Sequence, residues 1–265
     1  MGSIRSVLLH IDASARSAVR LRVARELAVT HDAVVTAMFA TYPCLIPMPY
    51  SFSDGFAPAL MMQEQDSVQR ARARALFEHA GKDMCWAEAL DSPPVPAFVG
   101  AALYADLLVL GQNDPTADSV PGDFVESVLI GSGKPALVIP HIGETGSIGR
   151  RVLIAWKPSP EAARALTAAL PLLPTADAVH LVTAEGEPAG AIELYLRRHD
   201  IDAEFHTTTA KPAEAGARLL ALAGDIGADL LVMGCYGHSR ARELVLGGAS
   251  RAVLQGMRLP VLMSH

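Results

Sequence analysis

The sequence is poor in the residues that stabilise small secreted domains and zinc ribbons. It has only three cysteines, Cys44, Cys85 and Cys235, which lie far apart and form no CxxC pair. Neither a disulfide framework nor a zinc ribbon is indicated, because both need cysteines at characteristic spacings. Aromatic residues are scarce at 5%, and the 21 glycines and 18 prolines are too few for a collagen-like or low-complexity chain.

A positive net charge and long apolar runs are also missing. The formal charge of -6 argues against general binding to nucleic acid or anionic lipid, because such binding requires Lys and Arg to neutralise phosphate. The apolar run near residue 8 is interrupted by His10 and Asp12, and it is too short for a signal-peptide core or a membrane span. We therefore expect a cytoplasmic protein with no nucleic-acid or membrane partner.

What the chain does have is a high apolar content, 51%, and an internal repeat. ADLLVLG at 105–111 returns as ADLLVMG at 228–234, and RSVLLHIDAS at 5–14 matches RRVLIAWKPS at 150–159. The repeat predicts two domains, 1–145 and 146–265, joined by a short flexible linker that is rich in Gly, Ser and Thr (141–149). The first copy is longer in its middle, and we place its extra residues in Tyr42–Pro58.

Short apolar runs alternate with helical periodicity in both copies, which predicts five strands in each. The expected strands are 7–11, 33–40, 84–90, 106–111 and 136–140 in the first copy, and 152–156, 178–184, 203–209, 229–234 and 261–265 in the second. Runs that are apolar almost throughout are typical of strands covered on both faces of a parallel sheet. We expect residues 14–30 to form an amphipathic helix capped by Ser14, with Val19, Val23 and Leu27 on its apolar side and arginines between them.

A glycine-rich segment follows the fourth strand of the second copy. Gly234 and Gly237 lie in a predicted loop, and Gly247 and Gly248 precede a helix that starts near Ala249. The free N–H groups of such a helix start favour a phosphate, and the hydroxyl of the nearby Ser250 would add a hydrogen bond. The alternative is a tight connection between strand and helix, with solvated arginines around it.

Gly234, Gly237 and Gly247 form the spacing G-x-x-G-x9-G, which resembles the ATP-binding signature of the universal stress protein family. The repeat resembles the tandem form of that family, from Val7 to His265. The resemblance implies two Rossmann-like, doubly wound parallel-sheet domains of the adenine nucleotide alpha hydrolase kind, packed as an internal pseudo-dimer through their last strands, with homodimers also expected. It also implies that ATP, or ADP or AMP, binds with Mg in the second domain. The residues implied for that site are Ala155, Trp156, Lys157, Val182, Met233, Gly234, Gly237, His238, Gly247, Gly248, Ala249 and Ser250.

Two residues of the second copy depart from the pattern of the family's nucleotide binders. Gly248 stands where a hydroxyl residue is usual, and Lys157 stands where an Asp is usual. The first copy keeps that acid as Asp12, but it has Asp123 at the position of Gly248 and no second glycine in its loop. A carboxylate at a helix start repels phosphate, so we expect no ATP in the first copy.

Other catalytic motifs are absent from the chain. It has no GxxxxGK[ST], GxGxxG or GxSxG sequence, and His180, His199, His206 and His238 lack the spacing of metal ligands. We expect these histidines to be satisfied or solvated, and Cys235 to be inert. The leading hypothesis is a stress-response binding protein without required catalysis. The alternatives are a scaffold that binds no nucleotide and a weak ATP-hydrolysing or adenylating enzyme.

The final strands of the two copies carry a further prediction. Residues 136–139 and 261–263 are apolar, and each would otherwise leave an exposed sheet edge. We expect them to pair antiparallel, because pseudo-twofold symmetry requires that direction for like edges.

Overall fold

The computed structural model describes residues 4–42, 56–80, 83–89, 93–116, 119–209, 211, 213–235 and 248–265. The strands are β1 (Ser6–Ile11), β2 (Val34–Phe39), β3 (Met84–Glu88), β4 (Leu107–Gly111), β5 (Ala136–Ile139), β6 (Arg151–Ala155), β7 (Ala178–Ala184), β8 (Glu204–Thr208), β9 (Leu230–Gly234) and β10 (Val261–Ser264). The helices are α1 (Arg16–His31), α2 (Phe56–Ala80), α3 (Pro94–Ala102), α4 (Phe124–Ser132), α5 (Pro160–Ala169), α6 (Gly190–Arg197), α7 (Ala215–Asp225) and α8 (Gly248–Gly256), with a 3-10 turn at Leu173–Thr175.

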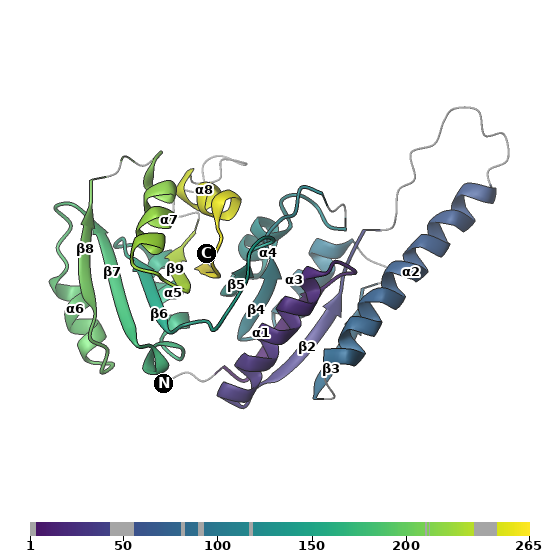
Figure 1. Ribbon diagram of the computed structural model, residues 1–265, viewed down its shortest axis with the longest axis horizontal. Helices are drawn as coiled ribbons and strands as arrows, with labels where there is room; N and C mark the ends of the chain where they lie inside the picture. The colour runs from purple at the N-terminus through teal and green to yellow at the C-terminus, as the bar shows by residue number, and fades with distance from the viewer. Residues whose placement is uncertain are drawn as a thin grey trace.

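The ten strands of the described residues form one sheet in the order β3-β2-β1-β4-β5-β10-β9-β6-β7-β8. Pairing is parallel within β1–β5 and within β6–β10, so the predicted α/β fold with a mostly parallel sheet is confirmed. Figure 1 shows the two halves side by side, with α2 at the outer edge next to β3. Among the described residues, no helix combines the length and the apolar character that crossing a bilayer requires.

Helices cover both faces of the sheet, and each face has its own apolar core. One core packs α1, α2, α5 and α6 against the sheet, and the other packs α3, α4, α7 and α8 against the opposite face. This arrangement explains why strand residues such as Leu107 and Leu108, which point to opposite faces, are both almost fully buried.

The two halves join where β5 meets β10. The strands are antiparallel, with Val261 opposite Val138, Leu262 opposite Leu137 and Met263 opposite Ala136. All six side chains are fully buried. The predicted antiparallel pairing of the two final strands is therefore confirmed, and it removes two apolar edges from solvent.

The repeated A-D-L-L-V sequence has the same structural role in both halves. Asp106, just before β4, accepts hydrogen bonds from the backbone N–H groups of Arg5 and Ser6 at 2.9 and 3.0 Å. Asp229, just before β9, accepts bonds of 3.0 Å from Gly149, Arg150 and Arg151. The aspartate thus joins the start of β4 to the start of β1, and the start of β9 to the start of β6.

The start of α1 differs from the expectation. The residue before the helix is Ala15, and no side chain caps the helix start; Ser14 instead donates to Asp12 at 2.5 Å. The Ser14 hydroxyl is directed to the carboxylate of Asp12 and not to the N–H groups at the start of the helix. The predicted cap at Ser14 was wrong.

The linker and the extra length of the first copy also differ from the expectation. Carbonyl oxygens of Pro140 and Gly143 accept hydrogen bonds from Arg16, and that of Thr145 accepts one from Arg22. These bonds tie the segment before the second half to α1, so it is not a free linker. Residues 43–55 lie outside the described residues, but part of the extra length is in α2, which has 25 residues where α6 has 8.

Candidate functional site

The topology of the second half brings several of the predicted site residues to one edge of the sheet. β6 lies between β9 and β7, and its last residue, Ala155, pairs with Met233 on one side and with Val182 on the other. The N–H of Trp156 then donates to the carbonyl oxygen of Val182 at 2.9 Å. The chain order reverses at β6, and the carboxyl ends of strands at such a point are where open α/β sheets bind ligands.

α8 completes this edge on the side of β9. The helix connects the parallel strands β9 and β10 and runs in the opposite direction to them. Its first residues, Gly248, Ala249 and Ser250, therefore lie at the carboxyl ends of the strands. Ser250 is buried, whereas Gly248 and Lys157 are exposed. No heavy atom of the described residues lies within 4 Å of a Cβ placed on Gly248. The predicted residues Gly237, His238 and Gly247 lie outside the described residues.

Gly234 has a packing role that the sequence did not reveal. A Cβ at this position would lie 2.4 Å from the backbone nitrogen of Ala162 and 2.6 Å from the carbonyl carbon of Glu161. The first turn of α5 therefore rests directly on the end of β9, and only glycine permits that approach. Ser159 caps the same helix by accepting a hydrogen bond from the N–H of Ala162 at 3.2 Å.

Cys235 follows Gly234 and is buried. Burial raises the pKa of its thiol to about 12, and the nearby carboxylate of Glu161 acts in the same direction. The thiol is therefore protonated at neutral pH, and a protonated thiol is a poor nucleophile and metal ligand. This agrees with the expectation that Cys235 is inert.

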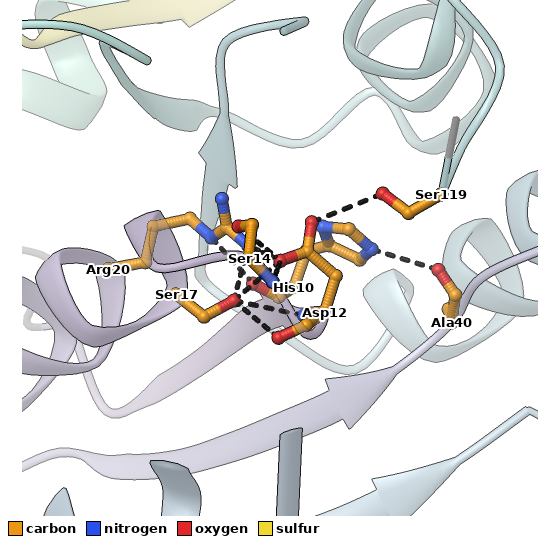
Figure 2. Close-up of polar contacts among 7 residues, drawn as sticks. All are labelled: His10, Asp12, Ser14, Ser17, Arg20, Ala40 and Ser119. Atoms are coloured by element: carbon orange, nitrogen blue, oxygen red, sulfur yellow. Dashed lines mark hydrogen bonds and ion pairs between the residues drawn. The ribbon is translucent and has the colours of Figure 1, made fainter. Parts of the chain in front are cut away.

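The matching edge of the first half is occupied by a buried ion pair, which Figure 2 shows. Arg20 of α1 donates to Asp12, which follows β1, at 2.8 Å, and both side chains are less than a tenth exposed. Asp12 also accepts hydrogen bonds from the hydroxyls of Ser14 and Ser17 at 2.5 and 2.7 Å. Burial alone would raise the pKa of Asp12, but Arg20 and these hydroxyls outweigh it and hold that pKa well below its ordinary value.

His10 lies beside this pair, and its Nε2 is 2.9 Å from the carbonyl oxygen of Ala40. The rings of Phe98 and Phe124 pack against the imidazole. Burial lowers the pKa of His10 to about 4, so the ring is neutral at pH 7. A neutral imidazole that is hydrogen-bonded to a backbone carbonyl and enclosed by aromatic rings is a core residue.

Little space remains at this edge. The guanidinium of Arg20 occupies the place beside Gly111, where a Cβ would lie 2.4 Å from its Nη1. The remaining cavity, lined by residues that include His10, Asp12 and Phe124, has a volume of about 30 Å³. That volume accommodates a water molecule or two, whereas sites for small molecules typically measure roughly 300–1,000 Å³.

The sequence pattern did not predict that Arg20 is buried. Val19 is half-buried against the apolar core, as expected, but the buried residues of this helix, Ser17, Arg20, Leu21, Val23, Ala24 and Leu27, include an arginine. Ser17, Arg20 and Ala24 follow a three- and four-residue spacing, so they share one face. That spacing, together with an acid, Asp12, just before the helix, was the feature of the sequence that could have indicated a buried ion pair.

Two histidines of the second half also differ from the expectation. His180 of β7 and His206 of β8 lie together, with His180 Nδ1 3.0 Å from His206 Nε2. The Nε2 of His180 is buried without a hydrogen-bond partner among the described residues, so His180 is not a satisfied core histidine. Spacing along the chain could not reveal this pair, because the register of two parallel strands creates it.

Comparison with known proteins agrees with the fold. Residues 173–265 match the model of the universal stress protein family. This part of the chain is a universal stress protein domain. Universal stress protein Slr1230 of Synechocystis is 30% identical over 176 residues, which cover 59% of this chain and 57% of that relative. The match thus spans little more than half the length of the relative.

Solved structures extend the likeness of fold over both halves. A universal stress protein from Archaeoglobus fulgidus superimposes with a TM-score of 0.71 at 20% identity, covering 98% of this chain and 95% of that one. A functionally unknown protein from Pseudomonas aeruginosa PAO1 gives a TM-score of 0.64 at 14% identity, covering 98% and 92%. At such identities the likeness concerns the fold alone.

Proposed function

We propose that this chain is a stress-response regulatory protein that binds one adenine nucleotide, ATP or alternatively ADP or AMP, with Mg²⁺ at its phosphates. The site is the carboxyl edge of the second half, where Ala155, Val182 and Met233 approach the start of α8. Occupancy of this site, rather than turnover, is the signal. The universal stress protein domain at 173–265 supports this assignment.

The contrast between the starts of α8 and α4 carries the proposal. α8 has no acidic residue in its first turn, and Arg251 lies there. Asp123 directly precedes its counterpart, α4, and Glu126 lies in the first turn of that helix. Helix starts attract anions through their free N–H groups and the macrodipole, and a carboxylate at the start already satisfies that attraction. Phosphates therefore favour α8 over α4.

The second contrast concerns the residues that follow β1 and β6, the first strand of each half. The repeat places Lys157 and Ala165 at the positions of Asp12 and Arg20. The buried ion pair that fills the first half therefore has no counterpart at these two positions of the second half. An alanine and an exposed lysine replace the arginine and the acid, so these two positions carry no buried carboxylate and place a positive charge at the edge where a nucleotide would lie.

Calorimetric titration with Mg-ATP tests the proposal, and Gly248→Asp is the decisive variant. The substitution introduces at α8 the carboxylate that Asp123 provides at α4, and an acid at a helix start leaves helix stability unchanged or raises it. We expect wild-type protein to bind one nucleotide per chain. Gly248→Asp should bind at least about tenfold more weakly, because juxtaposed like charges cost several kcal/mol at an interface.

Gly146→Asp is the matched control, since it makes the same change of charge at an exposed glycine with no neighbour within 4 Å among the described residues. Its affinity should equal that of the wild type. If the wild-type protein binds no adenine nucleotide, the nucleotide proposal is wrong and the alternative of a scaffold remains. ATP hydrolysis that Gly248→Asp abolishes would instead establish the weak enzyme. Two equivalent sites per chain would contradict the role given to Asp123.

The seam between β5 and β10 supports a proposal about assembly. We propose that the halves 1–145 and 146–265 are two domains that form an internal pseudo-dimer through this seam. The antiparallel register of Leu137 and Leu262 supports it. A size measurement on the intact chain distinguishes a monomer with this internal pairing from a homodimer of whole chains.

A further inference from the structure

His180, Glu204 and His206 form a cluster at the outer edge of the second half. Glu204 and His206 lie on the last strand of the sheet, β8, and His180 lies on its neighbour, β7. The parallel register pairs His180 with Glu204 and Val182 with His206. Register partners and residues two apart along a strand share one face of the sheet, so all three side chains leave the same face.

The potential ligand atoms of the three residues lie close together. His180 Nδ1 is 3.0 Å from His206 Nε2 and 3.4 Å from a carboxylate oxygen of Glu204, and His206 Nε2 is 3.9 Å from the other oxygen. The potential ligand atoms of the group all lie within 4.8 Å of one another. Two ligands bound to Zn²⁺ at about 2.0–2.1 Å in tetrahedral geometry are separated by roughly 3.3 Å. The observed separations bracket that value.

A hydrogen bond between the two imidazoles explains less of this geometry. A neutral imidazole has one N–H, so a bond between the rings uses a single proton, and neither of these two nitrogens then has an N–H left for the carboxylate. The Nε2 of His180 has no partner among the described residues, so every polar contact that offsets burial of this ring is at Nδ1. A cation bound by all three groups satisfies Nδ1, Nε2 of His206 and the carboxylate together.

We infer that His180, Glu204 and His206 bind one Zn²⁺ ion. Two imidazole nitrogens and one carboxylate oxygen are the ligand types that Zn²⁺ accepts, whereas Mg²⁺ and Ca²⁺ prefer sites made of oxygen. His180 lies nearer the start of β7 than the nucleotide-site residue Val182, and His206 is the register partner of Val182. The zinc site does not depend on nucleotide binding.

Solvent can supply the remaining ligand. The side chain of Glu204 is 69% exposed and that of His206 is 22% exposed, while His180 is 10% exposed. A cavity of about 170 Å³ is lined by His206 together with Val182, Arg218 and Asp225. An ion can therefore enter from the side of Glu204, and water can occupy the fourth tetrahedral position. The guanidinium of Arg151, whose positive charge acts on His180, donates to the carbonyl oxygen of Ile226 at 2.8 Å.

The test uses the full chain without a histidine tag, freed of metal by a chelator, because the sequence already contains nine histidines. Zn²⁺ is titrated in competition with a chromophoric chelator, and the Co²⁺-loaded protein reports tetrahedral coordination through its visible absorption. We expect one tight Zn²⁺ per chain. His206→Ala should bind at least about 100-fold more weakly, since even the loss of an outer-shell partner costs roughly 10–100-fold in metal affinity.

Two further variants keep the result interpretable. Glu204→Gln removes one ligand at a largely exposed position without changing the shape of the side chain, so the fold is retained and Zn²⁺ affinity should fall. His199→Ala removes a histidine that contacts only the ring of Tyr195 among the ring contacts of the described residues, and its Zn²⁺ affinity should equal that of the wild type. Circular dichroism confirms that each variant is folded.

Equal Zn²⁺ binding by wild type, His206→Ala and Glu204→Gln would overturn the inference, because the ion would then be held by other histidines. Absence of tight Zn²⁺ binding by the wild type would also overturn it and leave a hydrogen bond between His180 and His206. Both results are independent of the ATP titration, so the zinc site and the nucleotide site can fail separately.

Discussion

Gln112, the residue after β4, donates its side-chain N–H to the carbonyl oxygen of Leu254 in α8 at 2.7 Å, and so joins the two halves of the molecule. The same side chain accepts a hydrogen bond of 2.9 Å from the N–H of His141, where the chain leaves the first half. Gln112 is only 6% exposed. One buried amide thus connects β4, the end of α8 and the segment between the halves.

Replacement of Gln112 by alanine should lower the free energy of unfolding by about 1–3 kcal/mol. The substitution leaves the buried carbonyl of Leu254 and the N–H of His141 without their partner, and an unsatisfied buried group loses its hydration as well as its bond. Urea denaturation measures the loss. Gln255→Ala is the control, because Gln255 is exposed on the same helix and should change stability by less than about 0.5 kcal/mol. Equal losses in the two variants would contradict the role of Gln112.

Arg20→Met should destabilise the protein by about 3–5 kcal/mol, because it leaves the charge of Asp12 buried without its partner. A double variant, Asp12→Val with Arg20→Met, should recover much of that loss, since no buried charge remains. Thermal and chemical denaturation of both variants provide the comparison. Arg197→Met removes an exposed pair with Glu193 and should cost at most about 1 kcal/mol. A double variant that is less stable than Arg20→Met would contradict this account.

The sequence predicted the strands and their seam because those features depend on local pattern. Apolar runs bounded by turn residues identified β4 and β9, and the apolar final strands identified the pairing of Leu137 with Leu262. Arg20 was misjudged because its burial depends on Asp12, a partner brought close by the turn between β1 and α1. Charge alone predicts exposure, and only a tertiary contact overrides it.

The candidate sites divide along the same line. Ala155, Val182 and Met233 could be expected together because the order of strands places their ends side by side. The cluster of His180 and His206 could not be expected, because it depends on the register between β7 and β8. A shift of that register by two residues keeps every side chain on the same face, so the sequence pattern does not exclude it.

Because His10 is buried, we expect the free energy of unfolding to depend on pH. Burial holds its folded pKa at about 4, below the ordinary value of 6.5, so the unfolded chain binds the proton more readily. The stabilisation is fully present above pH 6.5 and is lost as the pH falls toward 4, by about 3 kcal/mol in total. Asp12, whose pKa is held low in the fold, contributes a further loss only at more acidic pH.

The free energy of unfolding, measured from pH 4 to pH 7 for wild type and His10→Gln, checks this dependence. Glutamine can still donate to the carbonyl oxygen of Ala40 but does not titrate, so the variant should show a smaller increase across this range. Parallel curves for the two proteins would assign the dependence to other groups, such as His31 and His180, whose pKa values burial also lowers.

Two glycines of α7 make opposite predictions for the same substitution. A Cβ on Gly216 would lie 2.6 Å from the carbonyl oxygen of Ala249 and 2.7 Å from the Cβ of Ala252, so α7 and the first turn of α8 must separate. A Cβ on Gly224 meets no heavy atom of the described residues within 4 Å. Gly216→Ala should therefore lower stability by about 1–3 kcal/mol through overpacking, and Gly224→Ala should raise it by about 0.4–1 kcal/mol.

The same pair tests whether α8 forms part of the nucleotide site. Displacement of Ala249 and Ser250 by Gly216→Ala moves the N–H groups that are proposed to face the phosphates, so ATP affinity should fall together with stability. Gly224→Ala leaves α8 in place, and its ATP affinity should equal that of the wild type. Calorimetry and thermal melting on the same samples separate the two effects. If Gly216→Ala loses stability but keeps full ATP affinity, the start of α8 lies outside the site, and the nucleotide must be held by the ends of β6, β7 and β9.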